Sequence, residues 1–488
     1  WFGWSKPIDS EPPTGVTQVF GKNMVNATGM SYAKVMALDS RNAADIPTEV
    51  FGTDEDEMAF ATLMKRETYI DFFNFSTSSP ANTLLWKWPV HPRSMKKTGP
   101  VENYVQGQPS LLAYLSCGAE LWRGSINYSL RAVKTPFHSG RIRVTFAPGA
   151  DESTDFAAVD LQKCYSQVFD LRESSDMEFC IPYVSNTIWR ITSDKVVSGP
   201  RAWTDICWSF PTGMIYVTVV NTLRGPATVA DSIEILGFAT GGKDFQFARP
   251  RVEPALRIVR SANDVTNFSY SGLAQSGMLV HSSIDESPAP NRAATGEIFT
   301  GFRQWLKRYT YFYKAQPLFA SWTPFAFTMY TPVGIVQDRL QEIDTRLFVG
   351  PLYRYVSGSQ RVMVARSDGG TEPYNFSVFT AVESPSAVPP QSDFSLDDPH
   401  GGLVTVTTNS ERIMEYEIPL YSSYTAIPTS IGNPIQSSGY TGNSSDFSRT
   451  ASNLGPRVFV SLSPEKFDIY SAAGESFCFG FQIGQPVI

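Results

Sequence analysis

The stretch FHSGRIRVTFAPGA, residues 137–150, has the clearest β-strand pattern in the chain. Ile142, Val144 and Phe146 alternate with polar residues such as Arg143. A period of two residues is typical of a strand with one buried face. The Gly and Pro residues near the ends of the stretch indicate turns. This stretch therefore predicts a strand in a sheet that packs against a second layer.

Similar short runs, separated by clusters of Gly, Pro, Asn, Asp and Ser, recur along both halves of the chain. Those in the first half are 68–76, 83–90, 121–133, 177–184, 187–193, 214–223 and 232–240. Those in the second half are 346–356, 360–367, 375–382, 402–409, 415–422, 457–463 and 476–484. We also expect short helices at 109–117 and around Phe302, Trp305, Leu306 and Tyr309, which follow helical spacing. About eight short strands in each half, joined by long connections, favour an all-β fold of two tandem jelly rolls with extended arms.

Changes in the residue pattern along the chain, from irregular to strand-like and back, predict four regions. Residues 1–55 show no sustained period and form an N-terminal arm that we expect to dock on neighbouring surfaces. The first jelly-roll domain covers 56–248 and the second covers 296–488. Between them, 249–295 has no strand texture and is predicted to be an interdomain arm, because so long a loop is uncommon inside one compact domain.

Composition excludes several classes of protein. With 488 residues, 42% hydrophobic and 18% charged, the chain is globular. Its net charge of -7 argues against a dedicated nucleic-acid-binding domain, although local basic patches remain compatible with it. Five cysteines without a CxxC pair and four scattered histidines predict no disulfide framework, no metal site and no cofactor. We also expect no membrane span and no signal peptide.

Several segments of the first half resemble one major capsid subunit of dicistroviruses, iflaviruses and marnaviruses, which are picorna-like viruses. They are WFGWSKP (1–7), FHSGRIRVTFAPGA (137–150) and FCIPYVS (179–185). Segments of the second half are similar to the subunit that surrounds the five-fold axes of these shells. They are GEIFTGFRQWLKRY (296–309), GPLYRYVSGSQRVMV (350–364), MEYEIPLYSSY (414–424), where Leu420 replaces the usual aromatic residue, and AAGESFCFGFQIG (472–484).

This resemblance implies a structural protein rather than an enzyme. Its jelly rolls would help to form an icosahedral shell that encloses a positive-strand RNA genome and delivers it into a host cell. The implied partners are copies of the chain, a third jelly-roll chain with or without a small internal peptide, genomic RNA and a host receptor. The implied location is the virion, and the host cytoplasm during assembly. The alternative from another class is a cellular tandem β-sandwich binding module of lectin-like type.

In the family, a viral cysteine protease cuts adjacent subunits apart after Gln and before a small residue. Gln275 and Ser276 offer such a pair within the predicted interdomain arm. Two interpretations stay open, a cleavage site and an ordinary loop dipeptide.

Asp397 and Asp398 form an adjacent acidic pair, which can raise one carboxyl pKa and so support proton transfer. An Asp-Asp-Phe motif in dicistroviruses is linked to maturation cleavage, but here Pro399 replaces the Phe. We favour the alternative, an exposed turn that Asp opens and Pro closes.

One basic cluster lies in the predicted interdomain arm and consists of Arg249, Arg251, Arg257 and Arg260. Packaging of RNA without sequence preference needs phosphate neutralisation rather than base recognition. These arginines are therefore candidates for RNA contact, and salt bridges to acidic neighbours are an equal alternative.

Overall fold

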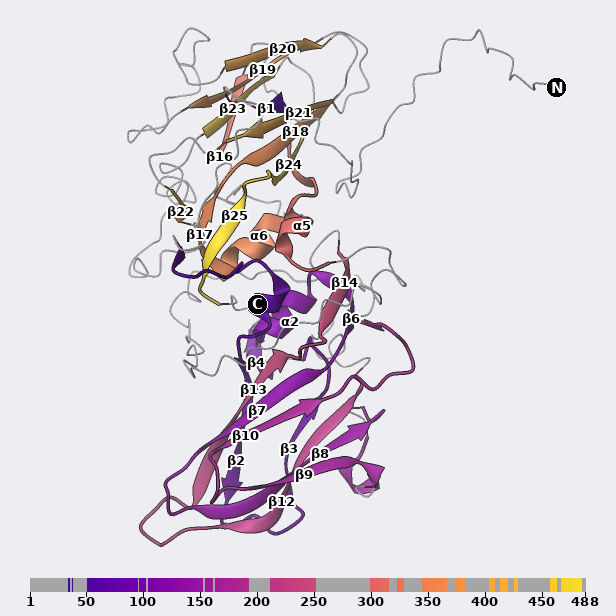
Figure 1. Cartoon of the computed structure of the whole chain (residues 1–488), viewed down its shortest axis with the longest axis vertical. Coiled ribbons are helices and arrows are strands. Elements are labelled where there is room, and N and C mark those ends of the chain that lie inside the picture. The colour runs from indigo at the N-terminus through magenta and orange to yellow at the C-terminus, as the bar shows by residue number, and fades with distance from the viewer. Residues whose placement is uncertain are drawn as a thin grey trace, which may run out of the picture.

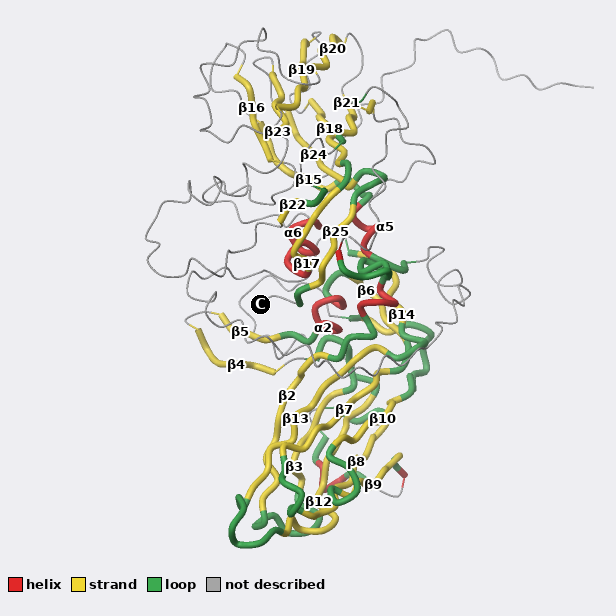
Figure 2. The backbone as a smooth tube through the Cα atoms, turned by 60° about the vertical axis from the view of Figure 1, so that its left-hand side comes forward, coloured by secondary structure: helices red, strands yellow, loops and turns green. Residues whose placement is uncertain are grey.

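A computed structural model gives the arrangement of the chain (Figure 1). It describes residues 34–35, 37, 51–94, 96–101, 104–151, 154–160, 163–192, 211–251, 299–315, 323–328, 345–366, 374–381, 403–408, 413–419, 425–428, 457–462 and 467–484. These residues build two β-sandwiches that stand end to end, with short helices between them (Figures 1 and 2).

The first sandwich consists of two four-stranded antiparallel sheets. One has the order β10 (Asp176–Ile181), β7 (Ile126–Val133), β13 (Ser232–Gly241) and β2 (Thr68–Ser76). The other has the order β3 (Leu84–Pro89), β12 (Gly213–Arg224), β8 (Ser139–Pro148) and β9 (Tyr165–Asp170). The alternation of apolar and polar residues along a strand determines which side chains face the core. In β8, for example, Ile142, Val144 and Phe146 are buried between the sheets. This eight-stranded order, in which sequential strands change sheets, is a jelly roll.

The second sandwich repeats this order. Its first sheet runs β21 (Ile413–Ile418), β18 (Gln360–Arg366), β24 (Phe467–Ala473) and β15 (Thr310–Ala315). Its second sheet runs β16 (Thr323–Thr328), β23 (Arg457–Leu462), β19 (Tyr374–Ala381) and β20 (Leu403–Thr408). A short strand from the start of the chain, β1 (Lys34–Val35), pairs in parallel with β21. The first half of the chain therefore reaches the edge of the second sandwich.

Each half also contributes the same smaller elements at the end that faces the other half. The first half has helices α1 (Phe60–Leu63) and α2 (Leu111–Ser116), and a sheet of β11 (Arg190–Ile191), β6 (Ala119–Arg123) and β14 (Gln246–Pro250). The second half has α5 (Phe302–Leu306), α6 (Thr345–Val349) with the 3-10 turn η5 (Gly350–Leu352), and a sheet of β22 (Ile427–Pro428), β17 (Tyr353–Ser357) and β25 (Cys478–Gln482). The remaining elements are the hairpin of β4 (Lys96–Val101) and β5 (Tyr104–Gln108), and the 3-10 turn η2 (Phe156–Ala158).

Local sequence explains where helix α2 begins. The hydroxyl oxygen of Ser110 accepts a hydrogen bond from the Ala113 backbone N–H at 3.1 Å and caps α2. The six residues of α2 are all buried, so packing on every side, rather than an amphipathic pattern, keeps this short helix in place.

The predicted fold class, two tandem jelly rolls, is confirmed. Two local predictions are corrected. Residues 346–356 were predicted as one strand, but α6 and η5 precede β17. Phe348 and Val349 are both buried, which a strand with one buried face does not allow. The helix predicted through Tyr309 ends at Leu306. The predicted domain boundaries stay predictions.

Candidate functional site: the contact between the two sandwiches

The two halves meet through a reciprocal backbone contact. Ala59 and Gly301 form an antiparallel bridge just before α1 and α5. The Phe60 N–H donates to the Thr300 carbonyl at 2.9 Å, and the Phe302 N–H donates to the Met58 carbonyl at 3.0 Å. Each half thus supplies the same kind of segment to the contact. We call this region the seam, comprising residues 51–66, α2, β14, 299–308, α6, η5 and β25.

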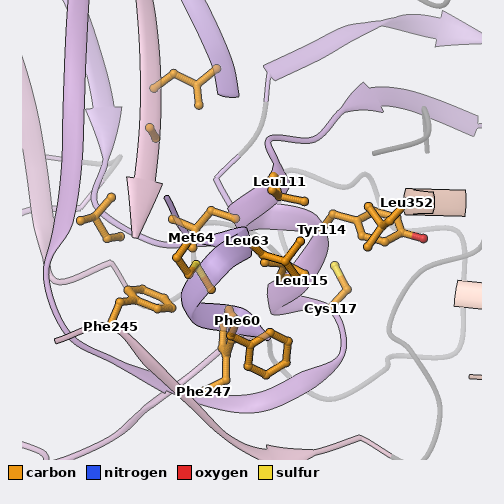
Figure 3. Close-up of a cluster of buried hydrophobic side chains, with 14 of the residues drawn as sticks. Phe60, Leu63, Met64, Leu111, Tyr114, Leu115, Cys117, Phe245, Phe247 and Leu352 are labelled. Atoms are coloured by element: carbon orange, nitrogen blue, oxygen red, sulfur yellow. The ribbon is translucent and has the colours of Figure 1, made fainter. Parts of the chain in front are cut away.

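Aromatic rings fill the centre of the seam. The ring of Phe60 meets Phe299 and Phe302 edge to face, with centroids 4.8 and 5.2 Å apart. Tyr114 of α2 stacks on Phe348 of α6, with centroids 4.5 Å apart and planes 4° apart. Figure 3 shows how the side chains of α1 and α2 gather around this centre. Fully burying such a side chain stabilises a structure by about 1.5–3 kcal/mol, so the seam resembles a domain core rather than a loose contact.

Three buried side chains of the seam form hydrogen bonds across the two halves. The Tyr114 hydroxyl donates to the Phe348 carbonyl, and the Tyr353 hydroxyl donates to the Glu57 carbonyl at 2.8 Å. The indole N–H of Trp305 donates to the Arg251 carbonyl at 2.9 Å. Burial raises the pKa of both tyrosines well above the ordinary value, so both remain protonated donors.

Glu57 anchors the first half to the last strand of the second half. Its carboxylate is 7% exposed and accepts hydrogen bonds from the backbone N–H groups of Phe481 and Gln482. Arg66 pairs with the same carboxylate at 3.2 Å. A buried carboxylate is stable only where it is paired and hydrogen-bonded, and this one meets both conditions.

The last strand, β25, lies very close to the first half at Gly480. A side chain at Gly480 would place its Cβ 2.2 Å from the Phe51 ring, so only glycine fits there. Because Gly480 has no side chain, the backbone of β25 packs directly against the Phe51 ring. The strand can therefore lie against the segment that begins at Phe51.

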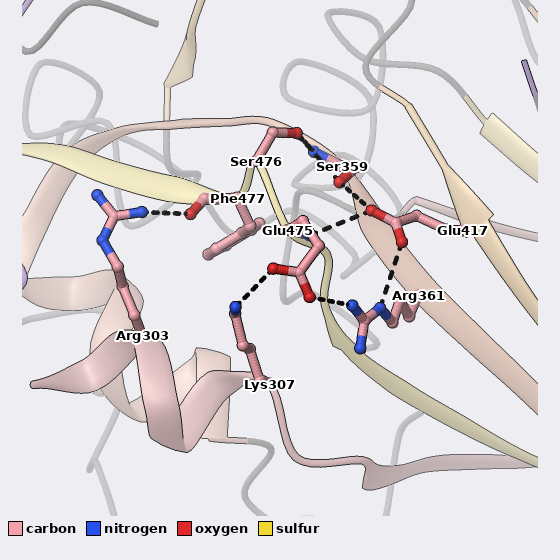
Figure 4. Close-up of polar contacts among 8 residues, drawn as sticks. All are labelled: Arg303, Lys307, Ser359, Arg361, Glu417, Glu475, Ser476 and Phe477. Carbon is pink, nitrogen blue, oxygen red and sulfur yellow. Dashed lines mark hydrogen bonds and ion pairs between the residues drawn. The ribbon is translucent and has the colours of Figure 1, made fainter. Parts of the chain in front are cut away.

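A polar network fixes α5 on the second sandwich (Figure 4). Glu475 accepts hydrogen bonds from Lys307 at 2.7 Å and from Arg361 at 2.5 Å. Those partners lower the pKa of the Glu475 carboxyl, with the hydrogen bond from Lys307 the largest cause. Glu417 is buried, and its carboxylate accepts hydrogen bonds from Arg361 at 3.3 Å and from the Ser359 hydroxyl at 2.6 Å. The network orients the helix that carries Phe302 and therefore supports the seam.

A buried histidine, His91, lies beside the seam in the first half. The His91 ring is 4% exposed, and its Nδ1 accepts a hydrogen bond from the Arg93 N–H at 3.1 Å. Its Nε2 lies 3.3 Å from the Ile191 carbonyl. Burial lowers the pKa of His91 to about 3, so the imidazole is neutral at physiological pH. This histidine is a structural group of the folded first half.

Two of the four arginines predicted to contact RNA lie in the described residues. Arg249 belongs to β14 and pairs with Glu120 at 3.0 Å. Arg251 donates to the Ala119 carbonyl at 3.1 Å and to the Thr192 hydroxyl at 3.2 Å. The salt-bridge alternative is thus visible for Arg249, and RNA contact stays a prediction. The other predicted residues, Arg257, Arg260, Gln275, Ser276, Asp397 and Asp398, lie outside the described residues.

Sequence reasoning did not identify the seam. A signal for it was available in the repeated order of elements, because a short helix precedes the first strand in both halves and another helix follows the second strand.

Within the described residues, no group of three or more His, Cys, Asp or Glu side chains is placed to hold a metal ion. None of the helices in that part of the chain is long and apolar enough to cross a membrane. What this site can do is hold two sandwiches in a fixed relation.

Comparisons with known proteins agree in both halves. A family model described as "CRPV capsid protein like" matches residues 287–488, and one described as "picornavirus capsid protein" matches residues 108–199. The structural polyprotein of Cricket paralysis virus is 30% identical over 256 residues, which is 51% of this chain and 28% of the polyprotein. That of Acute bee paralysis virus is 23% identical over 264 residues, which is 48% of this chain and 29% of the polyprotein.

The chain thus matches less than a third of the length of these two polyproteins. Among solved structures, the empty capsid of Triatoma virus is 30% identical, over 53% of this chain and 98% of that chain, with a TM-score of 0.44. The structure of black queen cell virus is 25% identical, over 53% of this chain and 99% of that chain, with a TM-score of 0.39.

Proposed function

Because this chain belongs to the capsid proteins of the picorna-like viruses, we propose that its two jelly rolls form part of an icosahedral shell that encloses a positive-strand RNA genome and delivers it into a host cell. The observation that carries the proposal is the seam. It joins two jelly rolls through buried aromatic rings and a buried carboxylate, as a building block of fixed shape requires. The role is structural, and we propose no catalytic activity for the chain.

The proposed partners are copies of this chain and a third jelly-roll chain, with or without a small internal peptide. Genomic RNA and a host receptor complete the set. Assembly would take place in the host cytoplasm, and the mature protein would lie in the virion. Closed point-group symmetry limits such a shell to contacts that repeat by rotation.

We further propose that Gln275–Ser276 is a cleavage site whose use leaves the two sandwiches associated. Both described ends of the connection, Arg251 and Phe299, lie at the seam, and the seam contacts named above are made by described residues on either side of that connection. Asp397 and Asp398 stay a prediction for maturation cleavage, and the turn remains the favoured interpretation. The lectin-like alternative has no support in the comparisons above.

Electron microscopy of natively purified material tests the proposal. We expect spherical shells of uniform size that contain this chain together with a third jelly-roll subunit. A dispersed monomer without a companion subunit, under conditions where related capsids assemble, would refute the capsid role. Mass spectrometry of the same particles would show whether the chain is cut after Gln275.

A further inference from the structure

The two halves of the chain repeat one another in sequence as well as in fold. Where a short helix leads into the first strand of each sandwich, residues 64–69 read MKRETY and residues 306–311 read LKRYTY. In β10 and β21, residues 177–182 read MEFCIP and residues 414–419 read MEYEIP. Both strands lie at the edge of their sheet, β10 beside β7 and β21 beside β18. β10 is therefore the counterpart of β21.

The outer edge of β21 carries an added strand, whereas the outer edge of β10 does not. β1 pairs in parallel with β21, with Lys34 opposite Tyr416 and Val35 opposite Glu417 (Figure 1). β10 is hydrogen-bonded to β7 on one side. Among the strands that the structure describes, none pairs with its other side. Such an edge presents a row of backbone N–H and C=O groups that can bind a further strand.

The reciprocal bridge at the seam identifies the segment that corresponds to β1 in the second half. Ala59 pairs with Gly301, so each residue before Ala59 corresponds to one that precedes Gly301 by the same distance in sequence. The counterpart of β1 is therefore 276–277. Residues 278–280, MLV, follow it directly, as residues 36–38, MAL, follow β1. A short apolar run at the matching position favours a strand there as well.

The connection between the halves is long enough to bring this segment to β10. Its described ends, Arg251 and Phe299, lie at the seam, and Ser276 is near the middle of the sequence between them. An extended chain spans about 3.3 Å per residue, so the residues on either side of 276–280 can each cover about 60 Å or more. The longest strand of the first sandwich, β12, has 12 residues and covers about 40 Å on the same scale. The edge of β10 is therefore within reach of the same chain.

We propose that residues 276–280 add in parallel to the outer edge of β10 in the same chain, as β1 adds to β21. In the register of β1, Ser276 lies opposite Phe179 and Gly277 lies opposite Cys180. Each half then supplies one strand to a sheet of the other, and the sheet of β10 gains the fifth strand that the sheet of β21 already has. This strand would hold the start of the second half on the first sandwich after a cut between Gln275 and Ser276. The inference goes beyond the proposed capsid function and does not rest on it.

Disulfide formation between the segment and β10 tests the pairing. Cys180 is exposed on β10, and Gly277→Cys places a second thiol opposite it in the proposed register. Neighbouring strands lie about 4.8 Å apart, which is within the Cα separation that a disulfide bridges. The purified full chain is oxidised mildly, and peptide mapping with non-reducing electrophoresis measures how fast the bond forms and whether it lies within one chain. The matched control is Asn263→Cys, in the same connection but outside the proposed strand.

We expect Cys180 to bond to position 277 about tenfold or more faster than to position 263, within one chain, because pairing raises the effective concentration of the two thiols. Adding Met278→Pro with Leu279→Pro should remove this advantage. Alternate residues of a strand donate to its neighbour, so one of the two prolines must lack an N–H that faces β10.

Equal rates at positions 277 and 263 would overturn the inference, and so would an advantage that survives the two prolines. A bond that joins two chains would show that another copy fills the edge, which would also overturn it. The measurement uses the unassembled chain, so a failure to form shells would count against the proposed function alone.

Discussion

Replacing Trp305 with alanine should uncouple the two sandwiches. Its side chain is 1% exposed and contacts Phe348 edge to face at 5.5 Å, and its indole N–H donates to Arg251 across the seam. Truncation of a buried tryptophan costs about 3–5 kcal/mol through lost contacts and the cavity left behind. Because the seam holds the halves together, this cost should fall on their coupling rather than on either sandwich alone.

Urea unfolding of the purified chain, followed by circular dichroism and intrinsic fluorescence, measures the effect. With a slope of about 2 kcal/mol per M, the Trp305→Ala chain should unfold about 1.5–2.5 M earlier at the transition that includes the seam. The two sandwiches should then unfold in separate steps. Trp86→Ala is the matched control, because Trp86 is a buried tryptophan inside the first sandwich, and it should destabilise that sandwich alone. A shift below about 0.5 M for Trp305→Ala would refute the assigned role of the seam.

Three further predictions concern single groups. Gly118→Ala would place a Cβ 2.9 Å from the Trp305 ring. The substitution should therefore lower the free energy of unfolding by about 1–3 kcal/mol in the same urea experiment. An unchanged free energy of unfolding would show that the ring can move freely. Glu57→Gln should lower the free energy of unfolding by about 1.5–3 kcal/mol, because it weakens charge-assisted hydrogen bonds to β25. The control is Glu55→Gln, which removes an exposed ion pair. An effect of Glu57→Gln no larger than that of the control would contradict the prediction. His91 has a pKa of about 3 in the folded chain against an ordinary 6.5, so unfolding takes up a proton below pH 6.5 and stability is lost as the pH falls from there toward 3. Stability measured against pH should fall less steeply for His91→Phe over that range, and identical profiles would exclude the histidine as a cause.

Much of the first sandwich could be predicted from the sequence, because one face of each central strand is apolar. The predicted strand at 68–76 matches β2 at both ends. The edge strand β9 could not be found in this way, since the four residues from Tyr165 to Val168 are all exposed and no alternation results. For 346–356, a run of aromatic and β-branched residues favoured a strand, whereas burial against α2 selected a helix.

The seam lay beyond such reasoning for a different reason. Tyr114 and Phe348 are 234 residues apart, and neither segment differs in composition from an ordinary core. Pairing over that distance depends on how two finished sandwiches fit together, which local patterns do not encode. A comparison of the two halves with each other would have shown the repeated helices and directed attention to the contact.

The reciprocal bridge between Ala59 and Gly301 has an evolutionary consequence. Since each half brings the same elements to it, the contact has the form of a homodimer whose two members have become one chain. A homodimer must accept every substitution twice, once on each side of its axis. Within one chain each side can drift alone, and Leu63 of α1 and Trp305 of α5 fill the seam with different side chains. Selection can therefore adjust one partner at a time, a freedom that two identical subunits do not have.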